Sequence, residues 1–165
     1  MASFNPIEKG VSVELKKIVL AAVAAGIAGG ALAQAKPEDE IRYRQSVMNV
    51  MGRAFGPMIN MAQDKIPYNK DVVAKNTPIV EMMAGLPWNS FGPGTDKGAP
   101  TKASTKIWTE GAKFKEGQDK AGQAIGKLAT AVKGGDEKAI KAAIADVGKT
   151  CKGCHDDFRE KEFRN

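Results

Sequence analysis

Residues 136–158 read DEKAIKAAIADVGKTCKGCHDDF, and this stretch decides the fold. Asp136 is a residue type that favours a helix N-cap, and apolar side chains then recur at alternating spacings of four and three residues. They are Ile140, Ile144, Val147, Cys151, Cys154 and Phe158. Such a continuous apolar seam is typical of a helix that packs against other helices. We therefore predict a helix that Asp136 caps and that runs to about Phe163.

Two amphipathic segments in the first half of the chain predict helices of their own. The first runs from Pro37 to about Gln63, because Pro and the acidic residues after it suit a helix N-terminus. We expect a bend in it at Gly56-Pro57. The second is capped by Asn69 and runs to about Ala84, and Pro78 predicts a kink or a late start.

A third segment runs from a cap at Ser104 or Thr105 to about Lys133, and Gly134-Gly135 ends it. Before it, residues 85–103 are rich in Gly and Pro, which predicts a long connection with a functional role. The chain has no alternating apolar and polar stretch long enough to indicate a sheet. The fold class predicted is therefore all-α, an antiparallel four-helix bundle.

The first 35 residues have the pattern of a cleavable signal peptide. Three lysines precede an uncharged run from Ile18 to Ala35, which ends in the small-x-small sequence Ala33-Gln34-Ala35. The alternative is a retained membrane anchor, but the run is rich in Gly and Ala and only weakly apolar. We expect residues 1–35 to be removed, which leaves residues 36–165 as one domain in the periplasm.

Composition narrows the possible chemistry. The chain has 165 residues, with two cysteines, one histidine and a net charge of +6. Loss of residues 1–35 would remove three Lys and two Glu and leave +5. Two Cys and one His cannot form a four-ligand zinc site, and two Cys cannot form a disulfide-dense scaffold. Any chemistry that needs histidine must use His155.

Both cysteines and the histidine fall within Cys151-Lys152-Gly153-Cys154-His155, the C-x-x-C-H pattern of covalent haem attachment. On a helix, two cysteines three residues apart can each form a thioether on one edge of the porphyrin, and His155 can bind the iron. A redox dithiol is the alternative for C-x-x-C, but it expects a βαβ context that this sequence lacks. With a single histidine, the sixth iron position is left to Met, a small molecule or nothing.

At this point the sequence resembles a family, cytochrome c′, the class II c-type cytochromes. The resemblance covers the chain after residue 35 and rests on the motif near the C-terminus of a four-helix chain, together with several further segments. These are Lys36-Pro37-Glu38-Asp39, Tyr43-Arg44-Gln45-Ser46, Leu86-Pro87-Trp88, Phe91-Gly92-Pro93-Gly94-Thr95 and Ile107-Trp108.

The resemblance implies a role for each candidate site residue. Cys151 and Cys154 would hold one haem c, and His155 would be the axial iron ligand. Arg44 and Gln45 match positions that contact the haem edge and its propionates in the family. Two residues match positions on either side of the iron, Met48 on the distal side and Arg159 on the proximal side.

The function expected is that of a periplasmic haem protein, not an enzyme, with a five-coordinate high-spin iron that binds nitric oxide or carbon monoxide, carries single electrons, or does both. The alternative is a low-spin electron-transfer cytochrome that resembles cytochrome c-556, with the iron between His155 and Met48. A haem-free helical interaction protein is a third hypothesis. The positive charge predicts acidic redox partners. The resemblance implies a homodimer through the first two helices, and we expect no contact with nucleic acid or, after cleavage, with a membrane.

Overall fold

The computed structural model describes residues 35–164. The predicted signal peptide lies outside the described residues, except for its last residue, Ala35. Among the described residues, 36–164 belong to one compact unit. Among the described residues, no helix is long and apolar enough to cross a membrane.

The first two long helices lie where the sequence predicts them. Helix α2 (Pro37–Ala62) starts with a proline and three acidic residues in its first turn. Helix α3 (Lys70–Ala84) is capped by Asn69, whose side chain accepts a hydrogen bond of 3.0 Å from the backbone N–H of Val72. Helix α3 already begins at Lys70, so the late start that Pro78 allowed is not observed.

The prediction of one continuous third helix is wrong at its start, where the chain forms two separate helices. The short helix α4 (Lys106–Thr109) is separated from α5 (Gly111–Gly134) by Glu110, whose φ and ψ of −116° and 42° are not helical. Tertiary contacts explain the break. The indole N–H of Trp108 donates to the carbonyl oxygen of Gly92 at 3.0 Å, which holds α4 on the preceding connection. The end of α5 agrees with the prediction, because Gly135 takes a left-handed φ of 78°.

Helix α6 (Glu137–Phe158) begins as predicted, since the carboxylate of Asp136 accepts a hydrogen bond of 2.6 Å from the N–H of Ala139. It ends five residues before the predicted Phe163 and continues as strand β2 (Arg159–Arg164). Strand β2 pairs antiparallel with strand β1 (Thr101–Ala103). The prediction of no sheet is therefore wrong. Strand β1 has only three residues, which is too short to show an alternating pattern. It forms a strand because it pairs with β2, which is distant in the sequence.

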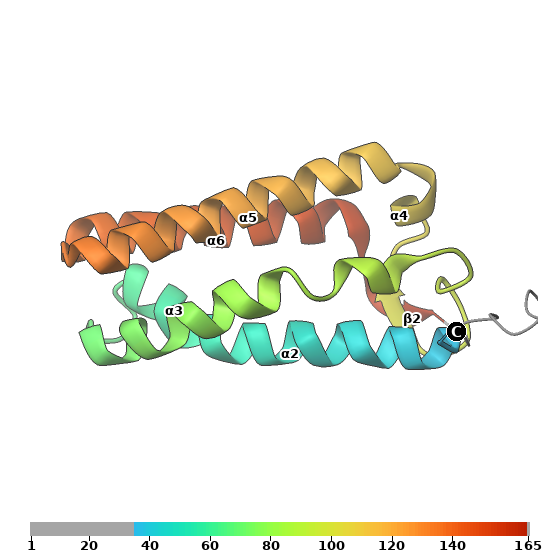
Figure 1. The fold of residues 1–165 in the computed structure, drawn as a ribbon, viewed down its shortest axis with the longest axis horizontal. Coiled ribbons are helices and arrows are strands. Elements are labelled where there is room, and N and C mark those ends of the chain that lie inside the picture. Colours follow the sequence, from blue (N-terminus) through green and yellow to red (C-terminus); the bar gives the residue numbers. More distant parts are fainter. Residues whose placement is uncertain (1–34, 165) are drawn as a thin grey trace, which may run out of the picture. The chain divides into compact units, whose positions relative to one another are not determined.

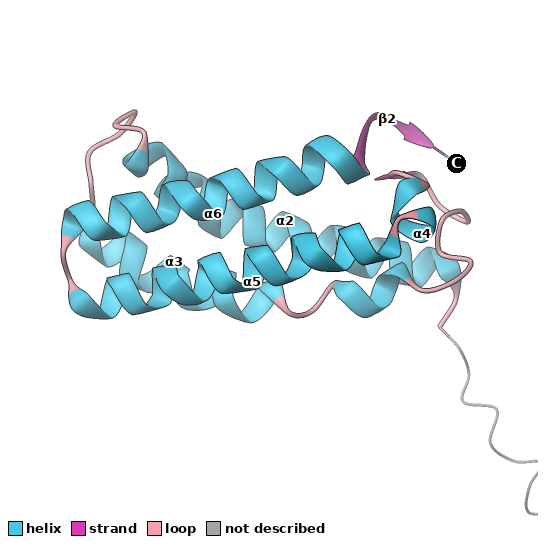
Figure 2. Cartoon of the chain, turned by 90° about the horizontal axis from the view of Figure 1, so that it is seen from above, coloured by secondary structure: helices cyan, strands magenta, loops and turns pink. Residues whose placement is uncertain are grey.

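The four long helices α2, α3, α5 and α6 lie side by side and alternate in direction (Figures 1 and 2). One end of this bundle carries the turn between α5 and α6, and the other carries the start of α2, helix α4 and the two strands. The 3₁₀-helix η2 (Trp88–Phe91) lies in the connection that leads to β1. Apart from the two short strands, the antiparallel four-helix architecture agrees with the prediction.

Helices α2 and α6 approach each other closely at a glycine. A Cβ atom at Gly148 of α6 would lie 2.9 Å from Cδ1 of Ile59 on α2, which is closer than real Cβ contacts. The surrounding core is apolar and almost fully buried, with Met58, Leu128, Ile140 and Ile144 each at most 1% exposed. This part of the bundle is packed without room for a ligand.

Candidate haem site

The candidate site residues all line one cavity of about 710 Å³ at the bundle end that holds the strands. They are Arg44, Gln45, Met48, Cys151, Cys154, His155 and Arg159. Every long helix of the bundle contributes to the wall, as do η2, α4 and both strands. The volume is in the range of cofactor sites, and the wall is mostly apolar. Residues more than a hundred positions apart in the sequence thus meet around one space.

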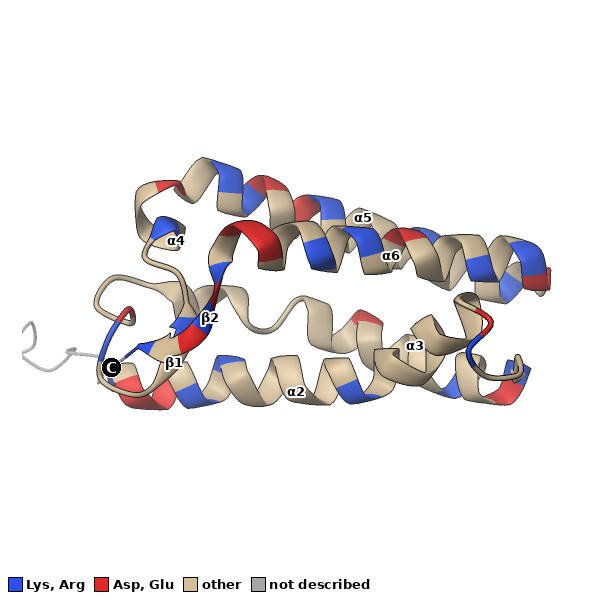
Figure 3. Ribbon diagram, turned by 180° about the vertical axis from the view of Figure 1, so that it is seen from behind, with Lys and Arg blue, Asp and Glu red and all other residues tan. Residues whose placement is uncertain are grey.

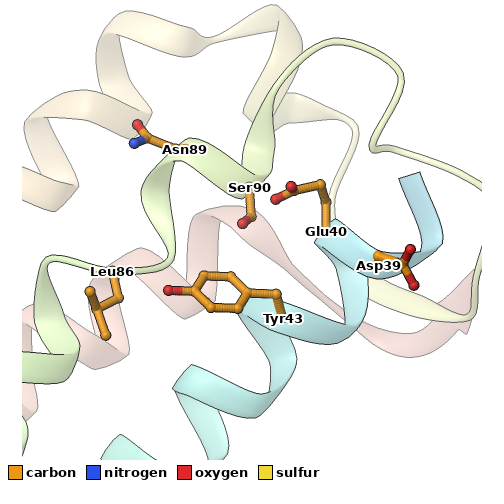
Figure 4. A pocket seen from close by; sticks show the side chains of 6 residues that line it. All are labelled: Asp39, Glu40, Tyr43, Leu86, Asn89 and Ser90. Atoms are coloured by element: carbon orange, nitrogen blue, oxygen red, sulfur yellow. The ribbon is translucent and has the colours of Figure 1, made fainter. Parts of the chain in front are cut away.

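A second hollow, of about 500 Å³, lies beside the first turns of α2 (Figure 4). Its lining residues are Asp39, Glu40, Tyr43, Leu86, Asn89 and Ser90. It contains neither cysteine nor histidine, and none of the candidate site residues lines it. Among residues 35–164, no group of three or more His, Cys, Asp and Glu side chains could hold a metal ion by itself.

Helix α6 brings the two cysteines and the histidine to the cavity. The Cys151 and Cys154 thiols are half-buried, and burial raises the pKa of both. Reactive dithiols have lowered thiol pKa values, so this environment does not favour a redox dithiol. His155 is exposed at the cavity wall, where partial burial of its ring and the neighbouring Arg159 lower its pKa. The lowered pKa favours the neutral imidazole, the form that binds iron.

Helix α5 comes close to the attachment motif at a glycine. A Cβ atom at Gly117 would lie 3.7 Å from Sγ of Cys154. Gly117 also lines the cavity, so the absence of its side chain leaves space beside the sulfur. The sequence pattern did not single out this residue, since a glycine within an amphipathic helix carries no periodic signal.

Aromatic rings from η2, α5 and α6 close one side of the cavity. Phe114 of α5 lies 5.1 Å from Phe91 and 5.2 Å from Phe158 between ring centroids, and both pairs are edge-to-face. Trp88 lies 6.0 Å from Phe114. Three bulky apolar residues of α2, Met48, Met51 and Phe55, line the cavity as well. The connection 85–103 thus contributes walls of the site, in line with the functional role predicted for it.

Arg44 is the most buried charged residue of the site, at 2% exposure. Its Nη1 donates to the carbonyl oxygen of Ser90 at 2.7 Å and to Oγ1 of Thr95 at 3.0 Å. Its Nη2 donates to the carbonyl oxygen of Thr95 at 2.8 Å and to Oγ1 of Thr101 at 3.4 Å. The guanidinium carbon also lies 4.5 Å from the centroid of the Phe91 ring. Burial lowers its pKa to about 10, which leaves it charged at neutral pH. Arg44 therefore holds the connection against α2, a role that its position in the sequence does not reveal.

Gln45 and Arg159 lie at the edge of the cavity. The Gln45 side-chain amide donates to the carbonyl oxygen of Pro100 at 2.9 Å, which adds a second link between α2 and the segment before β1. Arg159 follows the last residue of α6, and its backbone N–H bonds to the carbonyl oxygen of His155. Both side chains are exposed, whereas Met48 is half-buried.

Comparison with known proteins shows which family this chain belongs to. The family model described as Cytochrome C′ matches residues 39–159. The chain belongs to the cytochrome c′ family. Cytochrome c′ from Rubrivivax gelatinosus is 46% identical over 126 residues, which covers 76% of this chain and 98% of the relative. Its crystal structure has a TM-score of 0.72 to this chain over 76% of this chain and 98% of that one.

Two solved structures of cytochrome c′ variants from Alcaligenes xylosoxidans each hold a gas, one nitric oxide and the other carbon monoxide. Each is 39% identical to this chain with a TM-score of 0.69, and each match covers 77% of this chain and 98% of the solved chain. The cofactor of the cytochrome c′ family is covalently bound haem c, so this chain is a haem c protein with the two cysteines that attachment requires.

The cavity fits that cofactor by its chemistry. The half-buried thiols lie three residues apart on one helix beside the only histidine. The wall around them is apolar, and among the lining residues the charged side chains of Arg44, Lys102 and Arg159 are all basic. A porphyrin has an apolar ring and an anionic edge, so a cavity with apolar walls and basic groups suits it.

Proposed function

We propose that this chain is a periplasmic haem protein in which Cys151 and Cys154 form the thioethers and His155 is the axial ligand of a five-coordinate, high-spin iron. It binds nitric oxide or carbon monoxide and carries single electrons, and it is not an enzyme. The observation that carries the proposal is that the only histidine lines the same cavity as both cysteines. One imidazole at most can therefore reach the iron.

The residues of α2 support the five-coordinate state. Met48, Met51 and Phe55 present apolar surface to the cavity, and Met48 is half-buried there. Bulky apolar side chains exclude water and leave room for a small uncharged diatomic gas. When bound, the haem supplies the iron that takes up the gas or the electron. The nitric oxide and carbon monoxide complexes of the Alcaligenes proteins support the same class of ligand.

The position of Met48 also favours a second candidate. Its thioether lines the same cavity as His155, so it could be a sixth ligand in a low-spin electron-transfer cytochrome. Met ligation would raise the reduction potential and block gas binding. The two candidates differ only in whether the Met48 sulfur reaches the iron.

The visible spectra of the ferric and ferrous protein separate these candidates. We expect broad high-spin spectra, the formation of carbon monoxide and nitric oxide adducts, and the same spin state in Met48→Ala. A sharp low-spin spectrum with the charge-transfer band of methionine ligation, lost in Met48→Ala, would support the alternative. Met82→Ala is the matched control, because Met82 is 66% exposed and does not line the cavity. Mass spectrometry without a haem adduct would contradict both candidates.

The proposal includes a homodimer through α2 and α3 and acidic redox partners. Large apolar side chains are exposed on or directly after these helices, with Tyr43 and Val50 at 45%, Met82 at 66% and Leu86 at 42%. Exposed apolar patches are typical of interaction sites. We expect light scattering to give a dimer mass that Val50→Glu reduces to a monomer, whereas Thr130→Glu on the exposed side of α5 leaves it unchanged.

The localisation and the partner class need separate tests. The signal-peptide pattern of residues 1–35 supports export, and a mature protein whose N-terminal sequence starts at Lys36 is the expected result. The net charge of +5 after cleavage supports steering toward acidic proteins. Electron-transfer rates with an acidic partner should therefore fall as ionic strength rises.

A further inference from the structure

The charged side chains in the cavity wall all have one sign. Arg44, Lys102 and Arg159 line the cavity, and no Asp or Glu is among the lining residues. Arg44 and Lys102 lie at the strand end of the bundle, where hydrogen bonds join the first turns of α2 to the segment around β1. A ligand that places its anionic edge at this end would find positive charge and no repelling carboxylate. Haem c has two carboxylates on the edge opposite the thioethers.

Arg44 has little capacity left for such a carboxylate. An arginine side chain has five N–H donors, and four of them are on the two terminal nitrogens. Each terminal nitrogen of Arg44 already donates two hydrogen bonds, to Ser90, Thr95 and Thr101. The side chain is also 2% exposed. A carboxylate that took these N–H groups would break the links that hold the connection 85–103, so another cation is needed.

Lys102 of β1 is placed to be that cation. Its ammonium donates to the carbonyl oxygen of Lys161 on β2 at 2.6 Å, and it lies 4.8 Å from the centroid of the Phe163 ring. Both contacts hold a half-buried side chain at the cavity wall. A lysine has three N–H donors, so two remain for a ligand. The two strands thus hold a positive charge in position before any ligand binds.

Arg159 is placed differently. It follows Cys154 by five residues, and its backbone bonds to His155. The strand pairing places it opposite Ala103, next to Lys102, but its side chain is exposed. The half-buried Lys102 side chain, which two contacts hold, is therefore the cation with the better defined position.

We propose that Lys102 binds a haem carboxylate and that Arg44 positions the surrounding connection, an inference that rests on the attachment of haem through Cys151 and Cys154. The strands β1 and β2 then have a function in the site. They present the ammonium, and the pairing of β2 with β1 joins the end of the His155 helix to the segment that Arg44 holds. The family model ends at Arg159, so most of β2 lies beyond the matched residues.

The test uses the haem-loaded protein and two readouts that do not depend on gas binding. In Lys102→Met, loss of a cation beside the haem should lower the reduction potential, because positive charge favours the ferrous state. The propionate-bending band in the resonance Raman spectrum should shift as the carboxylate loses its donor. Lys102→Arg should restore both properties, since it keeps the charge.

Lys161→Met is the matched control. Lys161 is exposed on the adjacent strand and does not line the cavity, and its substitution keeps the backbone carbonyl that Lys102 bonds to. It should leave the potential and the Raman band unchanged. If Lys102→Met weakens the strands, Lys102→Gln keeps a donor for that carbonyl and removes only the charge. Native values in both Lys102→Met and Lys102→Gln, or equal shifts in Lys161→Met, would overturn the proposal. Failure of the five-coordinate assignment would appear in the spin state instead, and the two failures are therefore distinguishable.

Discussion

At one end of the bundle, where α5 turns into α6, buried apolar side chains fill the space between the helices, whereas at the other end the helices surround a cavity. We call the first the closed end, defined by Met58, Leu128, Ile140 and Ile144, and the second the cavity end, defined by the residues that line the haem cavity. The four residues that define the closed end are all apolar, whereas the cavity end contains the buried side chain of Arg44. The closed end is held together by apolar packing. The cavity end is held together by the hydrogen bonds of Arg44 and by the haem that fills the cavity.

Charged residues of both signs lie along α5 and α6 (Figure 3). Several form exposed ion pairs, such as Lys115 with Asp119. Exposed pairs contribute little to stability, about 0–1 kcal/mol each. The buried hydrogen bonds of Arg44 are therefore the polar contacts that should matter most for the fold. Each of the following predictions tests whether the two ends respond separately.

The largest effect is expected from removing both attachment sites. In Cys151→Ser/Cys154→Ser, the covalent haem should be lost completely, because no other cysteine is present. Amide protection should then fall at the cavity end, in η2 and the last turns of α6, and should persist at the closed end. Mass spectrometry and hydrogen exchange measure these two results. Equal loss of protection at both ends would show that the ends form one cooperative unit, contrary to the comparison.

A substitution at the closed end should have the opposite pattern. Leu128 is fully buried, so Leu128→Ala should lower the free energy of unfolding by about 2–5 kcal/mol through lost burial and the cavity it creates. The haem spectrum should stay unchanged, because Leu128 does not line the haem cavity. Chemical denaturation followed by circular dichroism measures the first effect.

Val132→Ala is the control for that variant, because Val132 lies one turn further along α5 and is only half-buried. Val132→Ala should lower the free energy of unfolding clearly less than Leu128→Ala does. A changed spin state in Leu128→Ala would contradict the separation of the two ends.

The same difference explains how much the sequence alone could predict. At the closed end, Ile140 and Ile144 belong to a simple period of apolar residues, and both the helix and its burial agree with the prediction. The caps at Asn69 and Asp136 were also predictable, because a cap depends on residues three positions apart. Local patterns carry this information, and the attachment motif is local as well.

The cavity end depends on contacts between distant segments, and there the predictions were incomplete. Arg44 bonds to residues 46 to 57 positions away, and Lys102 bonds to a carbonyl 59 positions away. The break at Glu110 and the strand β2 arise from similar contacts. No periodicity along the chain contains such information, so the resemblance placed Arg44 at the site but did not reveal what it holds.

The next effect in size is expected at Arg44. In Arg44→Met, the carbonyl oxygen of Thr95 loses its buried donor, whereas that of Ser90 keeps the hydrogen bond that Oγ1 of Thr95 donates to it. One unpaired oxygen should lower the free energy of unfolding by about 1–3 kcal/mol. The connection 85–103 should also become more mobile, and hydrogen exchange should show the loss of protection there. Arg42→Met is the control, because Arg42 lies on the same helix and is exposed. A stability loss in Arg42→Met as large as in Arg44→Met would contradict the role assigned to Arg44.

The smallest effect is expected from the helix cap at the closed end. In Asp136→Ala, the N–H of Ala139 loses its acceptor, which should cost about 1 kcal/mol of stability. Asp136→Asn should retain most of the stability, because an amide oxygen can accept the same hydrogen bond. The cap lies at the opposite end of α6 from His155, so the reduction potential and the spin state should stay at their native values in both variants. A shift of either value would mean that the start of α6 influences the haem through the length of the helix, and the two ends would then not be independent.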